Sequence, residues 1–217
     1  MSLAAFWAGL AALASGTTIP WTPAMAQAAH ITLPGFGHLV GQSTYTFEFW
    51  INSTGASGAA YSTTQGSYNC FEGLIPYGGL IYYDSGFIDA SGRMAVAPPS
   101  VFFNAFHHLV FQSDFEHEVR RIVLDGVVFA TETTPQSTYG SLATVPDDLL
   151  LFASQARMGE VRYWNSFRSL AEINDLKDVA LEGNFPDLLA CWRCDERGPS
   201  GTPVRDYSGN GFDGYIT

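Results

Sequence analysis

The sequence predicts an all-β protein, an antiparallel jelly roll made of two packed sheets. Residues 44–52 (TYTFEFWIN) place an aromatic or aliphatic side chain at every second position, as in a half-buried strand. From residue 28 onward, short strand-like runs are separated by turn residues, and Asp125-Gly126 is the strongest hairpin signal among them. Many short strands with one late helix are typical of a sandwich or jelly roll.

The other expected strands follow the same spacing. They are residues 79–84 and 87–89 as a hairpin, then 93–97, 106–112, 117–124, 127–132, 149–154, 160–164, 188–194 and 212–217. Residues 52–73, rich in Gly, Ser, Thr and Tyr, are expected to form a long neutral loop. We expect residues 28–33 to lie near residues 212–217. The side chains of Trp50, Trp164 and Trp192 are expected to be largely buried.

One helix is expected late in the chain, over residues 169–181. Ser169 occupies the N-cap position, Glu172 has the spacing of a capping box, and Gly183 follows the expected end. With 217 residues, the chain fits one large sandwich domain over residues 28–217, preceded by an apolar segment over residues 1–27.

Composition excludes several classes of partner. The formal net charge is −11, only 14% of the residues are charged, and Lys177 is the single lysine. Nucleic acids and anionic membrane surfaces are bound by clustered Lys and Arg, so neither is an expected partner. The apolar run near the N-terminus is also too short to span a bilayer.

The N-terminal segment resembles a secretion signal, with an apolar run over residues 3–14 and Ala24-Met25-Ala26 as a cleavage-like site. No Lys or Arg precedes the run, so we expect a retained segment instead. A helix there would be apolar on every side, which favours burial against other subunits. The residues expected to anchor the chain in an assembly are Leu3, Phe6, Trp7, Leu10 and Leu13.

Three cysteines are too few for a disulfide scaffold. Cys191 and Cys194 have the spacing of a redox or zinc site, but residues three apart on a strand face opposite sides. We therefore expect Cys70, Cys191 and Cys194 to be free thiols.

Five stretches, taken in order, resemble the laminin-G-like family of the concanavalin A-like lectin/glucanase superfamily. They are YTFEFWI at 45–51, FHHLV at 106–110, LDG at 124–126, GEVRYWN at 159–165 with the helix after it, and LACWRCDE at 189–196 with DYSGNGFDG at 206–214. The resemblance covers residues 28–217 and implies a two-sheet jelly roll. It does not fix a function, because this fold carries lectins, hydrolases and structural proteins.

A catalytic site is not expected. Glycosidases need two carboxylates flanking the scissile bond, whereas Glu48 stands alone on its strand. Asp114, Glu116 and Glu118 alternate around an expected turn and are interpreted as solvated charges. The adjacent His107 and His108 point to opposite faces of a strand, and the resemblance makes both structural.

The stretch at Asp206, Ser208 and Asn210 has two interpretations. Oxygen ligands at positions 1, 3 and 5 with glycine at position 6 copy the first half of a calcium loop. The alternative is a tight Asx turn that binds no cofactor at all. The acid expected at position 12 is missing, since that position is Thr217.

Three functions remain open, and a glycosidase is the least favoured of them because its pair of carboxylates is missing. The first is a non-enzymatic structural component on the surface of a large assembly, such as a virion decoration, cement or fibre protein. The second is a carbohydrate-binding adhesion module at a virion or extracellular surface, with Tyr61, Tyr68 and Phe71 of the neutral loop as sugar contacts. An ordinary surface loop, or one buried between subunits, is equally compatible with these three residues.

Overall fold

The computed structural model describes residues 30–40, 44–55, 57–63, 69–87, 93–133, 148–153 and 156–217. The expected anchoring segment and Tyr68 lie outside the described residues. Within the described part, no helix is long and apolar enough to cross a membrane.

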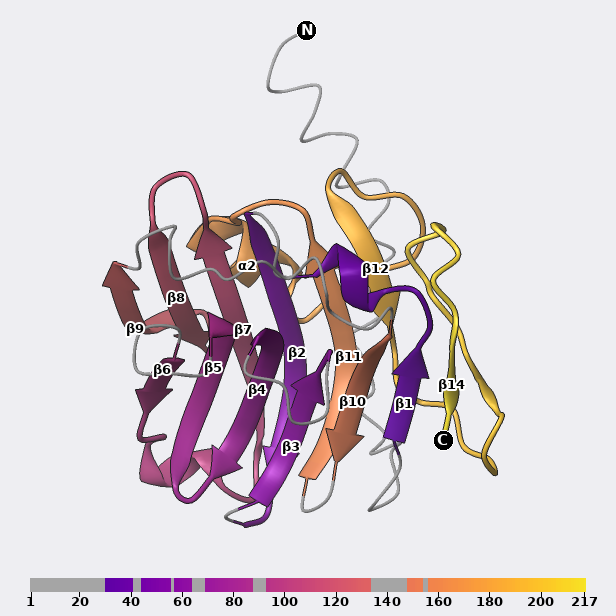
Figure 1. Cartoon of the computed structure of the whole chain (residues 1–217), viewed down its shortest axis with the longest axis horizontal. Helices are drawn as coiled ribbons and strands as arrows, with labels where there is room; N and C mark the ends of the chain where they lie inside the picture. Colours follow the sequence, from indigo (N-terminus) through magenta and orange to yellow (C-terminus); the bar gives the residue numbers. More distant parts are fainter. Residues whose placement is uncertain are drawn as a thin grey trace, which may run out of the picture.

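The described strands form two antiparallel sheets, stacked face to face as a sandwich (Figure 1). The larger sheet has eight strands in the order β13-β14-β1-β10-β3-β4-β5-β6, and the smaller has six in the order β12-β11-β2-β7-β8-β9. The bounds in the larger sheet are β1 His30–Leu33, β3 Ser57–Ser62, β4 Asn69–Tyr77, β5 Leu80–Phe87, β6 Arg93–Val96, β10 Leu149–Ala153, β13 Pro203–Val204 and β14 Gly214–Ile216. The bounds in the smaller sheet are β2 Tyr45–Ser53, β7 Phe106–Asp114, β8 Val119–Leu124, β9 Val127–Thr133, β11 Ala156–Trp164 and β12 Leu188–Trp192. The predicted fold class is confirmed.

The core between the sheets is aromatic. The inward positions of β2 are Tyr45, Phe47, Phe49 and Ile51, all fully buried, as the alternation in the sequence predicts. Their rings meet rings from the opposite sheet in edge-on contacts, for example Phe47 with Tyr61 at 4.8 Å between ring centroids.

The expected neutral loop over residues 52–73 is wrong in part. The structure forms β3 and the start of β4 there, and these two strands pair antiparallel. Tyr61 of β3 lies opposite Gly73 of β4, and the Tyr61 ring fills the space that a Cβ on Gly73 would occupy. The expected hairpin between residues 79–84 and 87–89 is also wrong, since β5 is one continuous strand that turns back on β4 through Gly78 and Gly79.

The helix α2 spans Leu170–Leu176 and is shorter than expected, but its capping box is present. The Ser169 hydroxyl accepts the Glu172 backbone N–H, and the Glu172 carboxylate accepts the Ser169 backbone N–H. Two short 3-10 helices, η1 at Gly37–Leu39 and η2 at Ser100–Phe102, complete the described elements. Residues of α2 pack on the outer face of the smaller sheet, where Ile173 contacts Val110 and Val123.

The first and last strands lie side by side, as predicted. Strand β1 runs between β10 and β14, with Ile31 opposite Ile216 in register. Trp164 and Trp192 are buried as expected. Trp50 is less completely buried than these two; it lies on the face of β2 that points away from the core, where its indole N–H donates to the Lys177 carbonyl at 2.9 Å.

Candidate functional site

A pair of tyrosines lies on the outer face of the larger sheet, at its β4–β6 end. Along β5, Ile81 and Tyr83 point into the core, so Tyr82 between them faces outward. Tyr77 at the end of β4 is 57% exposed, which is high for an aromatic side chain. The two tyrosine rings are 6.4 Å apart between centroids and tilted by 58°.

An arginine completes this group from the neighbouring strand. Arg93 opens β6, and its guanidinium lies 4.7 Å from the centre of the Tyr82 ring. Its Nε donates to Asp84 Oδ1 at 2.9 Å, and one terminal nitrogen donates to Oδ2 at 2.7 Å. Asp84 is fully buried, while the Arg93 side chain stays 31% exposed. We call Tyr77, Tyr82 and Arg93 the tyrosine platform.

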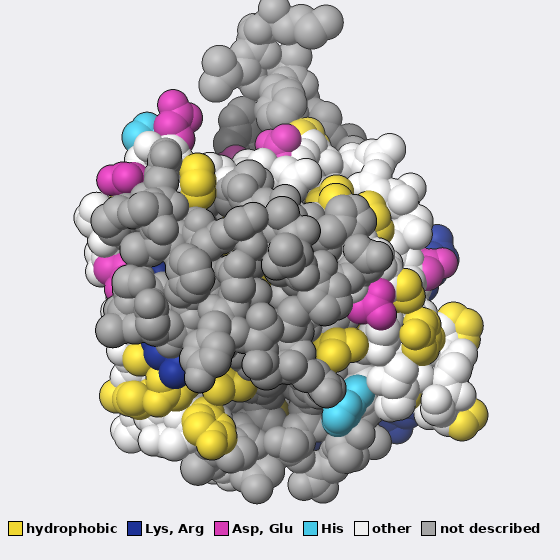
Figure 2. Space-filling model, viewed as in Figure 1, with side chains coloured by type: hydrophobic (Ala, Val, Ile, Leu, Met, Phe, Trp, Pro, Cys, Tyr) yellow, Lys and Arg dark blue, Asp and Glu magenta, His cyan; other side chains and the backbone are white. Residues whose placement is uncertain are grey.

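The platform is held in place by the sheet. Tyr82 is opposite Leu74 on β4 and Ala95 on β6, and Tyr77 is opposite Leu80 across the turn. Figure 2 shows hydrophobic side chains gathered next to a dark-blue basic group at the lower left of this face, over the β4–β6 region. Two neighbouring tyrosine rings, tilted against each other and bordered by the N–H donors of Arg93, offer an apolar surface with a polar border, which suits a ligand that has both kinds of surface.

The carboxylate of Asp84, beside the platform on the same face of β5, is costly to the fold. Burial raises the pKa of Asp84, and the hydrogen bonds and charge of Arg93, together with the charge of Arg120, only partly offset this. A buried carboxylate with a raised pKa beside an exposed aromatic surface is a common property of functional sites. Its bidentate contact also fixes the Arg93 guanidinium over Tyr82.

Two of the residues proposed as sugar contacts are corrected by the structure. Tyr61 and Phe71 are fully buried between the sheets, with ring centroids 4.8 Å apart, so neither ring can reach a ligand. Tyr68 lies outside the described residues. The sequence analysis missed the platform, although a signal was present: in YGGLIYYD at 77–84, two glycines mark a tight hairpin and alternation leaves Tyr77 and Tyr82 on one face.

The turn at Asp206, Ser208 and Asn210 has the hydrogen bonds of an Asx turn. Asp206 Oδ1 accepts the backbone N–H groups of Cys191 and Ser208, at 3.0 and 2.9 Å. Asp206 Oδ2 accepts the Ser208 hydroxyl and the Phe212 N–H. Asn210 donates its amide to the carbonyls of Leu188 and Leu189. These contacts use both carboxylate oxygens of Asp206. No cluster of three or more His, Cys, Asp or Glu side chains suited to a metal occurs among the described residues.

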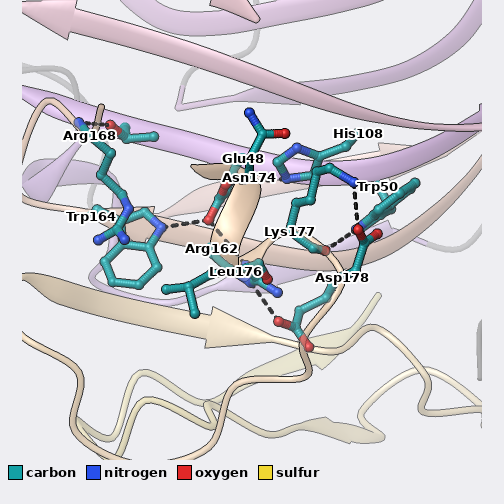
Figure 3. A network of polar contacts seen from close by, with 12 residues as sticks. Glu48, Trp50, His108, Arg162, Trp164, Arg168, Asn174, Leu176, Lys177 and Asp178 are labelled. Carbon is teal, nitrogen blue, oxygen red and sulfur yellow. Dashed lines mark hydrogen bonds and ion pairs between the residues drawn. The ribbon is translucent and has the colours of Figure 1, made fainter. Parts of the chain in front are cut away.

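A buried polar network lies on the outer face of the smaller sheet, beneath α2 and the segment after it (Figure 3). At its centre Glu48 accepts the Trp164 indole N–H at 2.7 Å and pairs with Arg162 at 3.3 Å. Glu160 pairs with the same guanidinium at 2.6 Å, and His108 Nε2 lies 3.2 Å from Glu48 Oε2. These five side chains, Glu48, His108, Glu160, Arg162 and Trp164, form the Glu48 network.

This network ties the sheet to the helix. Arg162 donates further to the carbonyls of Leu176 and Val179, at 3.0 and 2.6 Å, where α2 ends and the chain continues. Every member of the Glu48 network is at most 2% exposed, so a substrate has no access to Glu48 or Glu160. Burial alone would raise the pKa of Glu48, but the charge of Arg162, with the contacts of His108 and Trp164, lowers it to about 2.

The two adjacent histidines face opposite sides, as predicted. His108 belongs to the Glu48 network, whereas His107 Nδ1 contacts Asp125 Oδ2 at 2.7 Å and its Nε2 contacts the Val101 carbonyl at 3.0 Å. Both residues therefore join elements of the fold.

Cys191 and Cys194 are free thiols, as predicted, and the side chain of Cys70 is outside the described part. Cys194 packs in the core between the sheets, while Cys191 packs on the outer side with Trp164 and Leu188. Burial raises the pKa of both thiols well above the usual range. The CxxC spacing thus makes no shared redox or zinc site.

Comparison with solved structures finds the same fold in several proteins. A carbohydrate binding protein from Bacteroides ovatus, described as putative, aligns with a TM-score of 0.63 at 16% identity, over 88% of this chain and 57% of its own. The binding domain of botulinum neurotoxin DC, in complex with rat synaptotagmin II, aligns at 0.53 and 8% identity, over 84% of this chain and 52% of its own. The CBM40 of the Ruminococcus gnavus IT-sialidase aligns at 0.51 and 12% identity, over 70% of this chain and 94% of its own.

This chain therefore spans little more than half the length of the first two structures, and at these identities the likeness shows the fold alone. No curated protein sequence matches the chain. The model of one family, described as the concanavalin A-like lectin/glucanases superfamily (Laminin_G_3), matches residues 26–174. That match covers more than half of the sequence, and the two-sheet antiparallel sandwich agrees with it. The chain belongs to the concanavalin A-like lectin/glucanase superfamily.

Proposed function

We propose that this protein is a non-enzymatic carbohydrate-binding module that holds a saccharide on the tyrosine platform. The observation that carries the proposal is the exposed Tyr77 ring beside Tyr82, with Arg93 fixed over Tyr82 by a buried carboxylate. Pyranose rings have apolar C–H faces that stack on tyrosines and hydroxyl groups that accept hydrogen bonds from an arginine. An extracellular or surface location belongs to the same proposal.

Several features support binding over catalysis. Glycoside hydrolysis requires two carboxylates that reach either side of the scissile bond. Glu48 and Glu160 share one guanidinium, but both are sealed from solvent by the sheet and the segment around α2. Asp84 beside the platform is likewise buried and is bonded through both oxygens to Arg93. Solved relatives of this fold include proteins named for carbohydrate binding.

The decisive experiment compares tyrosine variants on a glycan array and in calorimetric titrations. Tyr77→Ala and Tyr82→Ala should each weaken saccharide binding by about tenfold or more, which corresponds to the loss of one stacked ring. Tyr215→Ala is the matched control, because Tyr215 is an exposed tyrosine of the same sheet that lies on β14, near the opposite edge. All three variants should melt within a few degrees of the wild type.

Equal loss of binding in all three variants, or no loss in the two platform variants, would refute the platform as the site. The role as a structural component of a large assembly rests on residues 1–27, which lie outside the described residues. It stays a hypothesis that the relatives found here do not support, and deletion of residues 2–16 would test it through the oligomeric state.

A further inference from the structure

The charges beside the tyrosine platform are balanced. Asp84 and Arg93 form a bidentate pair in which the carboxylate is fully buried. Arg120, also fully buried, adds its charge to the surroundings of Asp84 and is itself paired with Glu132. Among the described side chains, each of these two guanidinium groups therefore has a carboxylate partner.

The rings themselves have apolar neighbours. Leu74, Leu80 and Ala95 are the register partners of the two tyrosines, and Gly78 and Gly79 form the turn next to Tyr77. Arg93 is therefore the charged group in contact with the tyrosine rings among the described residues, and its charge is already matched by Asp84.

The net charge of the whole chain also disfavours acidic ligands. With a formal net charge of −11, the protein repels an anionic ligand before contact. An acidic sugar would have to overcome this repulsion at a site where Arg93 is already paired with Asp84. A neutral sugar needs only stacking on the rings and N–H donors.

Resting on the proposed function, we infer that the platform selects neutral saccharides and discriminates against sialylated and uronic acid glycans. Arg93 then serves as a positioned hydrogen-bond donor stacked on Tyr82, and not as a counter-charge.

The test uses the full wild-type chain and an array in which each neutral glycan has a carboxylated counterpart. Suitable pairs are cello-oligosaccharides with cellouronates, manno-oligosaccharides with mannuronates, and N-acetyllactosamine with its sialylated form. We expect at least one neutral member to bind about tenfold or more tightly than its acidic counterpart at roughly 10 mM salt, where charge effects reach far. Its affinity should change little at roughly 500 mM salt, where they are screened.

A second arm removes the balancing charge. Asp84→Asn keeps the shape of the side chain but removes the carboxylate charge that Arg93 is bonded to. The ratio of acidic to neutral affinity should therefore rise by about threefold or more, and it is read as a ratio because loss of the bond that positions Arg93 weakens the binding of both glycans. A thermal melt reports whether the variant is folded, and the wild-type array decides the question if it is not.

The outcomes separate the two proposals. Preference for an acidic glycan that is lost in Tyr77→Ala and falls with salt would overturn the inferred neutrality and leave the carbohydrate-binding function standing. Absence of binding by every member of the array, or binding that Tyr77→Ala leaves intact, would overturn both.

Discussion

At the scale of single residues, two buried carboxylates, Glu48 and Asp84, affect the stability of the folded state in opposite directions. Glu48 is held ionised by Arg162 and by neighbours that donate to it, and its pKa is lowered to about 2. Asp84 lies beside an exposed surface, and its pKa is raised by burial. Glu48 therefore stabilises the folded state at neutral pH, whereas ionised Asp84 lowers its stability in return for positioning Arg93.

Because the pKa of Glu48 is lowered in the folded state, the free energy of unfolding depends on pH. Its folded pKa of about 2 lies below the ordinary value of 4.5, so its stabilisation is complete above pH 4.5 and is lost as the pH falls toward 2. The loss is on the order of 3 kcal/mol in the free energy of unfolding. Urea titrations between pH 5 and 2 should show this slope in the wild type and a much shallower one in Glu48→Gln. The exposed Glu116→Gln should keep the wild-type slope, and an equal slope in Glu48→Gln would contradict the assignment.

Breaking the Glu48 network at neutral pH has its own cost. Glu48→Gln leaves Arg162 with one carboxylate in place of two, in a site at most 2% exposed. Removal of one partner from a buried pair costs roughly 3–5 kcal/mol in the free energy of unfolding. The cost here should be smaller, because Glu160 still pairs with Arg162. The variant should thus be less stable at pH 7 and less sensitive to acid.

At the scale of elements, the turn of the β8–β9 hairpin is hydrogen-bonded to α2. Asp125 and Gly126 both have positive φ, at 51° and 79°, as a two-residue turn of this kind requires. Asn174 of α2 donates its side-chain amide to the Gly126 carbonyl at 3.0 Å. A Cβ on Gly126 would collide with the Asn174 amide group, so the hairpin and the helix fit together only with glycine there.

The close approach of Asn174 to Gly126 allows the cost of a steric clash to be measured apart from the cost of backbone strain. Gly126→Ala combines left-handed backbone strain with a clash against Asn174, and should lower the free energy of unfolding by roughly 2–4 kcal/mol. Gly183→Ala has a similar φ of 88° and open space around the added methyl group, so it should cost about 1 kcal/mol from strain alone. Chemical denaturation of both variants measures the difference. Equal losses would show that Asn174 moves aside without cost.

At the scale of the whole molecule, the C-terminal turn fastens the edge of the sandwich. Asp206 collects the N–H groups of Cys191, Ser208 and Phe212, so it connects β12 of the smaller sheet to the segment that leads into β14 of the larger one. The side chain is buried, and these amides have little access to water without it.

Asp206→Ala should therefore lower the free energy of unfolding by about 3 kcal/mol or more, since each orphaned buried donor costs roughly 1–3 kcal/mol. Asp195→Ala, at an exposed carboxylate, serves as the control and should change little. Calcium or a chelator should leave the melting temperature of the wild type unchanged. A calcium-dependent rise that is absent in Asp206→Ala would restore the calcium-loop interpretation.

Local rules in the sequence predicted much of this architecture. The alternation of residues 45–51, the Asp125-Gly126 turn and the Ser169 capping box each depend on near neighbours, and each is present. The strand SGAAYS at Ser57–Ser62 escaped prediction because it lacks the branched residues typical of strands. What makes this segment a strand is its pairing with β4 and β10, a long-range property that no short window contains.

The candidate site was harder to predict for a related reason. Tyr61, Phe71, Tyr77 and Tyr82 are equally aromatic in the sequence, and only register decides which rings face solvent. A shift of one residue in β5 would exchange Tyr82 for Tyr83 on the surface. Composition indicated an aromatic, weakly charged protein, whereas the identity of the exposed rings follows from the pairing of β4 with β5.

The placement of β1 between β10 and β14 has a consequence for how the protein is made. Strand β1 leaves the ribosome early, but one of its hydrogen-bonding neighbours is residue 216. During translation apolar Ile31 waits without its β14 partner while some 180 further residues are synthesised, which takes roughly ten to forty seconds at the usual pace. Leu33 gains its partner, Leu149 of β10, sooner. The pairing of β1 with β14 forms only after residue 216 is made, so the nascent chain depends on whatever shields this side of β1 in the meantime.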